Sequence, residues 1–272
     1  MLIDKPTLRD IDKIKSYIHR HNDDMRCDLA THRRLTRIQI EEANYHSAQL
    51  ELPVIALYEP TTTAIQKVQL RKIRNRIIEN IQNAYQWAMI HYALNPPFIG
   101  CIAARVDPKL FQNVSEAPTR KDAVRLLGSY HIPTRPEKIP AALNTLFSQI
   151  ETTPMHPVER AAYIHFHLLR IHPFSDSNGR TARIAQNAVL MYAHYAPVVI
   201  ERGERDFYNA LLDQAVGGYR ERESQEIPSL EKLTQSELKF YNYIASKELI
   251  SLEHIARILD KKQMSRTKHK TH

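Results

Sequence analysis

Apolar side chains recur at helical spacing through most of the chain, and polar side chains fill the positions between them. These stretches are rich in Leu, Ala, Gln, Lys, Arg and Glu, which lose little conformational freedom on entering a helix. The pattern therefore predicts an all-α protein. The predicted helices lie near residues 7–21, 33–50, 62–94, 136–151, 155–171, 178–195, 204–216, 230–246 and 251–260.

Two segments interrupt the helical pattern. Residues 52–62 (LPVIALYEPTT) contain β-branched residues and prolines, so they end the preceding helix and connect two helical layers. Residues 127–136 (LGSYHIPTRP) combine an early glycine, a short β-favouring stretch and two prolines. That composition is typical of an exposed β-hairpin or flap.

The composition limits the classes of function to consider. A chain of 272 residues can bury a substantial core in one domain with a small appendage. Cys27 and Cys101 have no close spacing, so neither a disulfide framework nor a cysteine metal site is indicated. We find no signal peptide and no apolar run of membrane length, so we expect a soluble cytoplasmic protein without a membrane partner.

The net charge of +8 is a mild excess of basic side chains, part of which lies in residues 261–272 (KKQMSRTKHKTH). We expect this basic tail to be disordered. The excess is compatible with a phosphate-bearing ligand, but by itself it does not indicate nucleic acid.

The most informative segment is residues 172–183 (HPFSDSNGRTAR), which lies between two apolar helical runs. Pro173 ends the first helix, and Asn178 and Gly179 can begin the second. The free N–H groups and the positive dipole end of that second helix would then face the loop. This arrangement predicts a phosphate-binding site.

The charged and titratable side chains of this segment extend the prediction. Arg180 and Arg183 share one face of the first helical turn and could bind separate oxygens of a polyphosphate. Asp176 is a hard oxygen ligand suited to Mg²⁺ on the same phosphates, and His172 could take a proton from an incoming hydroxyl. The combination indicates phosphoryl or nucleotidyl transfer; the structural alternative is a solvated loop capped by Asn178.

The segment resembles the signature of the Fic family, H-x-F-x-(D/E)-G-N-G-R-x-x-R. The one departure is Ser177, which replaces a glycine. The preceding helix, the segment GSYHIPTRPEKIP and the helix RDFYNALLDQA also resemble the family, so the similarity covers about residues 33–216. The matching motif residues are His172, Phe174, Asp176, Asn178, Gly179, Arg180 and Arg183.

This resemblance implies an all-α Fic-type core with a short β-hairpin flap that docks the target. It implies a protein adenylyltransferase that moves AMP from ATP onto a Ser, Thr or Tyr hydroxyl of a target protein, with Mg²⁺ as the cofactor. His172 would deprotonate that hydroxyl, Asp176 would hold Mg²⁺ between the α- and β-phosphates, and Phe174 would anchor the loop. Asn178 and the backbone near Gly179 would hold the α-phosphate, and Arg180 and Arg183 the β- and γ-phosphates.

Two positions leave alternatives open. Ser177 belongs to the same phosphate-binding segment, and its side chain leaves open whether another phosphate-containing donor replaces ATP. Tyr208 falls where the family often lines the adenine pocket, although core packing would explain it equally well.

Upstream, NYHSAQLELP resembles the family's inhibitory helix, (S/T)-x-x-x-E-(G/N), with Ser47 and Glu51 at the matching positions and Leu52 as a departure. Glu51 could pair with Arg183 and occupy the guanidinium that would otherwise bind the γ-phosphate. The alternative is that Glu51 is a solvated acid at a helix end.

The sequence after residue 228 resembles the beginning of a winged helix-turn-helix, with LEHIARIL as a first short helix and MSRT opening the second. DNA binding, partner docking and an evolutionary remnant are all compatible with it. We therefore expect an N-terminal helical segment with the inhibitory helix (1–61), a catalytic core (62–227) and a partial winged-helix-like appendage with the basic tail (228–272).

Two other functions fit the sequence. One is a Fic transferase of another phosphate-linked group, and the other is a catalytically silent regulator that binds nucleotide, or nucleic acid through the appendage. The sequence does not identify the target protein, and a homo-oligomer is compatible with it.

Overall fold

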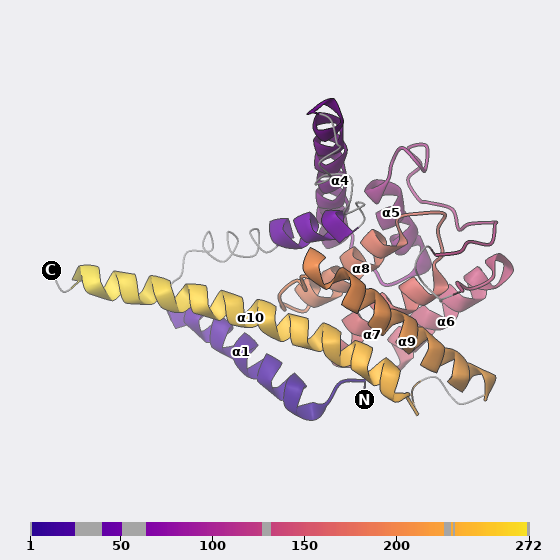
Figure 1. The fold of residues 1–272 in the computed structure, drawn as a ribbon. Helices are drawn as coiled ribbons and strands as arrows, with labels where there is room; N and C mark the ends of the chain where they lie inside the picture. The colour runs from indigo at the N-terminus through magenta and orange to yellow at the C-terminus, as the bar shows by residue number, and fades with distance from the viewer. Residues whose placement is uncertain are drawn as a thin grey trace.

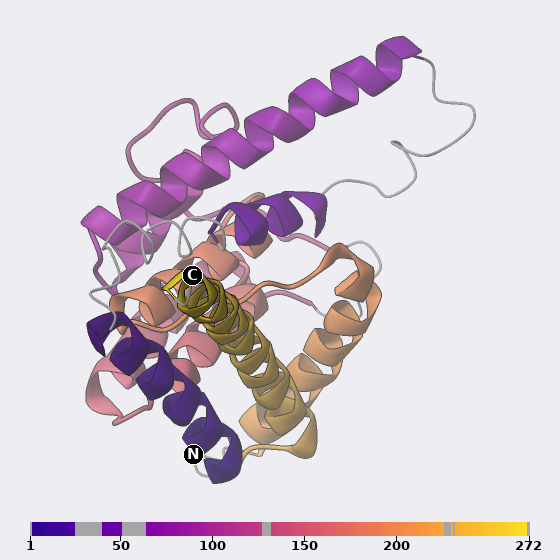
Figure 2. The same ribbon diagram turned by 90° about the vertical axis from the view of Figure 1, so that its left-hand side faces the viewer.

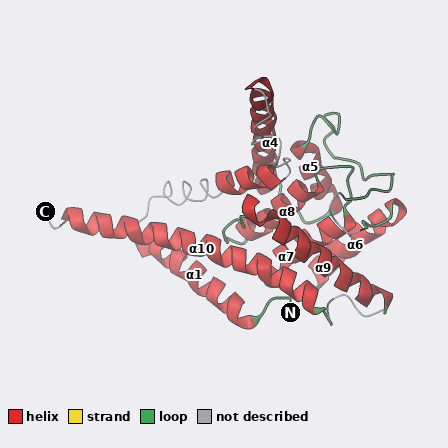
Figure 3. Cartoon of the chain, viewed as in Figure 1, coloured by secondary structure: helices red, strands yellow, loops and turns green. Residues whose placement is uncertain are grey.

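The chain is described by a computed structural model over residues 2–24, 40–50, 64–126, 132–225, 230 and 232–270. The described residues form helices joined by irregular segments and contain no β-strand (Figures 1 and 3), which confirms the all-α prediction. The helices are α1 (Lys5–Asp24), a helix over residues 40–50, α4 (Ala64–Ile90), α5 (Pro96–Val106), α6 (Ile139–Thr152), α7 (Pro157–Ile171), α8 (Asn178–Tyr192), α9 (Arg205–Ser224) and α10 (Gln235–Lys270).

Some predicted features lie outside these residues. They are the connection over residues 52–62 and the centre of the predicted flap, residues 127–131. Residues 132–135, at the C-terminal end of the flap, have no regular secondary structure, so the β-hairpin stays a prediction. None of the helices in the described ranges is both long and apolar enough to cross a bilayer.

The sequence analysis missed α5, which begins with Pro96 and Pro97. Proline is tolerated in the first turn of a helix because the N–H that it lacks has no partner there. Asn95 caps the helix, and its side-chain oxygen accepts a hydrogen bond from Phe98 N at 2.9 Å. The proline pair therefore marks the start of this helix.

Helices α7 and α8 form the centre of the molecule. Nearly every residue of both is buried, as expected for helices covered on all sides. Helix α8 packs against α7, α4 and α5, and α7 packs in addition against α6 and α10. The loop that joins α7 to α8 is the predicted phosphate-binding segment, so the core fixes both of its ends.

Helix α10 differs from the sequence prediction. It is continuous from Gln235 to Lys270, so the break expected between residues 246 and 251 is absent, and the tail expected to be disordered is helical as far as Lys270. Figure 2 shows α10 between α1 and α9, and it contacts both. Phe240, Tyr241 and Ile244 are at most 1% exposed, so its first turns belong to the core.

This continuity corrects the winged-helix interpretation. A helix-turn-helix needs a turn between two short helices, and α10 has none up to Lys270. In Figure 1 its C-terminal half extends beyond the other packed helices, alongside α1. From Gln235 to Lys270 this region is therefore one long helix and not a compact DNA-binding module.

Glu248 is a charged residue inside this core. It is fully buried on α10, and its Oε1 accepts a hydrogen bond from Ala196 N at 3.0 Å. Its Oε2 has no hydrogen-bond partner among the described residues. Burial raises the pKa of the Glu248 carboxyl well above its ordinary value, although the Ala196 N–H and the Lys15 ammonium oppose this. The folded state therefore favours the protonated form of Glu248 more than the unfolded chain does.

Replacing Glu248 with Gln should stabilise the protein increasingly as the pH rises. Gln keeps an acceptor for Ala196 N without a charge. Because the folded pKa is raised, the parent loses stability above the unfolded pKa of about 4.5, and the variant does not. The variant should gain about 1.4 kcal/mol of stability over the parent for each pH unit between the unfolded pKa and the raised folded pKa.

Urea unfolding at about pH 5 and pH 8 measures this difference. Glu253→Gln, at a half-exposed position of the same helix, should change stability by less than about 0.5 kcal/mol at either pH. A Glu248→Gln effect that is the same at both pH values would contradict the assignment.

Candidate active site

The loop between α7 and α8 turns through two residues with left-handed backbone conformations. His172 ends α7 with φ 53° and ψ 61°, and its N–H still donates to Leu168 O at 2.9 Å. Pro173 follows, so the helix cannot continue. Ser177 precedes α8 with φ 69° and ψ 7°. The chain is therefore reversed tightly between two buried helices.

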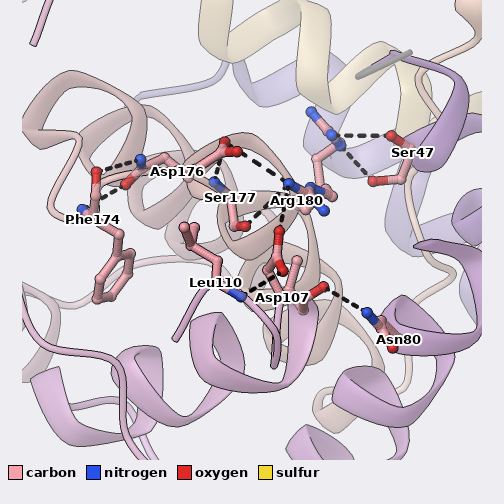
Figure 4. Close-up of polar contacts among 11 residues, drawn as sticks. Ser47, Asn80, Asp107, Leu110, Phe174, Asp176, Ser177 and Arg180 are labelled. Carbon is pink, nitrogen blue, oxygen red and sulfur yellow. Dashed lines mark hydrogen bonds and ion pairs between the residues drawn. The ribbon is translucent and has the colours of Figure 1, made fainter. Parts of the chain in front are cut away.

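Asn178 holds this loop together. Its side-chain oxygen accepts a hydrogen bond from Phe174 N, and its side-chain nitrogen donates to Phe174 O, both at 2.9 Å (Figure 4). The Phe174 ring is 2% exposed and lies edge-on to Phe111, as expected for an anchor. The Asn178 side chain thus fixes the main chain of the loop, and its expected contact with the α-phosphate stays a prediction.

Ser177 occupies a backbone conformation that glycine adopts without strain. A positive φ costs a residue with a side chain about 1–2 kcal/mol, which gives a physical reason for glycine at this place in the signature. The Ser177 hydroxyl is buried and accepts a hydrogen bond from Arg180 Nη2 at 3.0 Å. Part of the backbone strain is offset by this contact.

Arg180 lies between two carboxylates. Its Nη2 is 3.8 Å from Asp176 Oδ1 and 3.9 Å from Asp107 Oδ2, and the Arg180 side chain is only 7% exposed. Asp107 caps the C-terminal end of α5, and its Oδ1 accepts a hydrogen bond from Leu110 N at 3.1 Å (Figure 4). The sequence analysis missed Asp107 because it missed α5.

Arg183 is held by a different element. Its Nε donates to Ser47 Oγ at 2.8 Å, and its Nη2 donates to Ser47 O at 3.3 Å. Ser47 is buried in the helix over residues 40–50, and Glu51 lies outside the described residues. The two arginines, expected to act together from one helix face, are therefore directed by α5 and by the residue 40–50 helix respectively.

A cavity of about 400 Å³ opens at this loop. Of the predicted site residues, it brings together His172, Asp176, Gly179 and Arg183, whereas Ser177, Asn178 and Arg180 do not line it. Its other walls are formed by Leu50, Val124, Arg125, Leu126, Leu169, Ser175, Arg205, Tyr208, Asn209, Leu212 and Asp213.

One wall of the cavity is a face of α9 that begins at Arg205. Its members recur three or four positions apart, which is a helical pattern that could have identified them from the sequence. Tyr208, on this face, forms a hydrogen bond with His165, whose Nε2 lies 2.8 Å from the Tyr208 hydroxyl. Burial, with a contribution from Arg183, lowers the pKa of His165 to about 3. His165 is therefore neutral near pH 7 and orients Tyr208.

The cavity has the composition of a polyphosphate site. The first N–H groups of α8 and the Arg183 guanidinium offer donors to anionic oxygens. His172 supplies an imidazole in the same cavity, and the Asp176 carboxylate lies at its edge with the side chain 63% exposed. These groups could bind a phosphate chain and take up a proton beside it.

A family model and named relatives both relate part of this chain to Fic proteins. Residues 102–190 match the model of the Fic/DOC family. The chain is 38% identical over 102 residues to a protein of Nematostella vectensis named protein adenylyltransferase Fic, covering 36% of this chain and 24% of that protein. It is 40% identical over 91 residues to the protein of the same name from Aedes aegypti, covering 32% and 18%. The chain thus spans a quarter or less of the length of these relatives.

The solved structures show the same fold over most of the chain. A Fic domain containing signaling protein from Bacteroides thetaiotaomicron aligns with a TM-score of 0.67 at 23% identity, covering 93% of this chain and 98% of that one. Residues 134–508 of Fic-1 from C. elegans align with a TM-score of 0.63 at 20% identity, covering 93% and 73%.

Replacing Asn178 with Ala should destabilise the folded protein by about 2–4 kcal/mol. The change leaves the N–H and C=O of Phe174 buried without partners, and each such group costs free energy. Chemical unfolding measures the loss. Ser175→Ala, at an exposed position of the same loop, should stay within about 0.5 kcal/mol of the parent. Equal stability of the two variants would show that Asn178 does not hold the loop.

Proposed function

The chain belongs to the Fic/DOC family through residues 102–190, and from that premise we propose that it is a protein adenylyltransferase. In this proposal it transfers AMP from ATP to a Ser, Thr or Tyr hydroxyl of a target protein. The observation that supports it most is the cavity that joins His172, Asp176 and Arg183 at the start of α8. The named relatives support the same reaction, but they share only a part of their length with this chain.

The donor would lie along the start of α8. The main-chain N–H groups near Gly179 would bind the α-phosphate, and Arg183 would bind the terminal phosphate. Arg180 is held by Ser177, Asp107 and Asp176, so it would support the phosphate-binding loop from behind by positioning Ser177 and Asp176.

Asp176 fits the magnesium ion that the family implies. It is a hard oxygen ligand, largely exposed at the cavity edge. Within the described ranges no group of three or more metal-binding side chains occurs, and Mg²⁺ commonly takes one or two carboxylates together with phosphate oxygens. Bound there, the ion would neutralise charge on the phosphates.

His172 would act on the acceptor. Its imidazole would remove the proton from the target hydroxyl as the oxygen attacks the α-phosphorus. The bond between the α-phosphorus and the bridging oxygen to the β-phosphate would break, and pyrophosphate would leave. The left-handed conformation of His172 supports this role because it turns the residue's carbonyl away from α7, while its N–H stays bonded to Leu168 O.

Replacing His172 with Ala should abolish transfer while leaving ATP binding nearly unchanged. The imidazole acts on the acceptor, so its loss should lower the labelling rate by about a hundredfold to ten-thousandfold. The Kd for ATP should change by less than about twofold. Labelling with radioactive ATP and calorimetric titration measure the two quantities.

His254→Ala is the matched control, because His254 is exposed on α10, away from the cavity. Labelling at the parent rate by His172→Ala would exclude this residue as the base. Loss of ATP binding in proportion to labelling would also contradict its assignment to the acceptor.

We further propose that the residue 40–50 helix inhibits the enzyme. Ser47 already binds Arg183 through its hydroxyl and its carbonyl. Glu51 follows Ser47 by one helical turn in the sequence. Its carboxylate would complete the contact and compete with the terminal phosphate of ATP for the Arg183 guanidinium.

Replacing Glu51 with Gly should raise labelling by about tenfold to hundredfold, because a charged hydrogen bond that opposes ATP is lost. Ser47→Ala should give a smaller gain, because the Ser47 carbonyl still accepts from Arg183. Initial rates of labelling at saturating Mg·ATP measure both.

Two controls accompany this test. Glu42→Ala removes an exposed acid from the same helix and should have no effect. Arg183→Ala should give no gain, because it removes the inhibitory contact and the phosphate ligand together. If Glu51→Gly labels no faster than the parent, the inhibitory role is wrong.

The alternative donors and the silent regulator are less well supported. Ser177, which suggested another donor, does not line the cavity, and its hydroxyl is directed to Arg180. A regulator that binds DNA through residues 228–272 would need a helix-turn-helix, whereas α10 is continuous to Lys270. Transfer of AMP with ATP as the donor is therefore the function that the site supports best.

A further inference from the structure

Arg120 connects the catalytic loop to Asp122, which precedes the predicted flap (residues 127–136), and to Thr134 near the C-terminal end of that flap. Its main-chain N–H donates to Pro173 O at 2.9 Å, and its side-chain Nε donates to His172 O at 2.8 Å. Its Nη1 donates to Asp122 O at 2.7 Å, and its Nη2 donates to Thr134 O. One side chain thus binds three carbonyl groups from three places in the chain.

The position of Arg120 is itself fixed by the core. The segment that carries it is tied to α5, because Ala117 N donates to Gly100 O at 2.9 Å. A Cβ at Gly100 would lie 2.6 Å from the Glu116 side chain and 3.2 Å from Ala117 O, so glycine allows this close approach. Arg120 is only 7% exposed. The guanidinium is therefore a rigid reference point and not a mobile surface charge.

The described side-chain partners of Arg120 are all main-chain carbonyl groups. Within the described part of the chain its side chain contacts main-chain carbonyls and no carboxylate. The planar guanidinium offers five N–H donors in a fixed fork, which suits three carbonyls around one plane. The contacts do not depend on the side chains of His172, Asp122 or Thr134, so they set backbone position alone.

The contact with His172 has a specific consequence. A left-handed conformation is strained for a residue with a side chain and persists only where the surroundings hold it. In His172 this conformation turns the carbonyl out of the helical ladder, and Arg120 Nε binds it there. The adjoining Pro173 carbonyl is bound by the Arg120 N–H. Loss of these contacts would let the catalytic loop relax.

We propose that Arg120 is a positioning residue, which holds the backbone of His172 at a fixed place relative to Asp122, before the predicted flap, and Thr134, within it. This inference rests on the proposed function, in which His172 is the base. Arg120 does not line the cavity, so it sets where the imidazole lies relative to the acceptor without contacting the donor.

Arg120→Lys tests the proposal because lysine keeps the charge and the aliphatic stem but has one nitrogen in place of the fork. The kcat for labelling should fall by about tenfold to hundredfold, as expected for a small displacement of a reacting group. The KM for ATP and the calorimetric Kd for ATP should stay within about twofold. Lys121→Ala, which removes the exposed cation next to Arg120, should leave both unchanged.

A second readout does not need activity. Amide hydrogen exchange should become faster in residues 172–177 and 132–135 of Arg120→Lys, and should be unchanged in Lys121→Ala. If the parent transfers no AMP under any condition, the proposed function fails, but this exchange comparison still decides whether Arg120 holds the two segments together.

The proposal is overturned if Arg120→Lys matches Lys121→Ala in exchange or in kcat. It is also overturned if ATP affinity falls in proportion to the rate, since Arg120 would then act on the donor. Circular dichroism establishes that each variant is folded. If Arg120→Lys does not fold, Arg120→Gln, which keeps one N–H donor group without the charge, is compared with Lys121→Ala in the same two measurements.

Discussion

The packing of α7 against α8 is the constraint on which the site depends. Both helices are buried on nearly all sides, so neither can move without disturbing the core. The loop between them is short, and it must turn the chain through two left-handed residues, His172 and Ser177. The core fixes both ends of the loop, and the Asn178 side chain fixes its middle.

The positive charges around the loop are held in place by separate parts of the chain. Arg180 is bound near the end of α5, Arg183 is bound by Ser47, and Arg120 is bound by main-chain carbonyls. Each of these arginines is at most 7% exposed, and each has hydrogen-bond or ion-pair partners that offset the cost of burial. A site that binds anions needs such cations in place beforehand, because reorganising them during the reaction would raise the barrier.

The sequence predicted the parts of this arrangement that local chemistry determines. Helical periodicity gave the all-α class, and Pro173 and Asn178 gave the ends of α7 and the start of α8. It failed where tertiary packing decides. A break was expected near residue 250, yet α10 continues because its apolar positions pack against α1 and α9. Arg120 and Asp107 carry no local signal, since their partners are main-chain groups or lie far away in sequence. The double contact of Asn178 with Phe174 was not predicted, because a motif gives residue types but not the direction of a side chain.

The double hydrogen bond of Asn178 also affects the chemical ageing of the protein. An asparagine followed by glycine deamidates readily in a flexible chain, because the next main-chain nitrogen can attack the side-chain carbonyl and close a succinimide ring. Here Asn178 precedes Gly179, but its carboxamide is held against Phe174 and both residues lie in the first turn of α8. The attacking nitrogen and the carbonyl carbon are therefore kept from the geometry of ring closure. The hydrogen bonds that shape the loop thus also protect Asn178 from deamidation for as long as the protein stays folded.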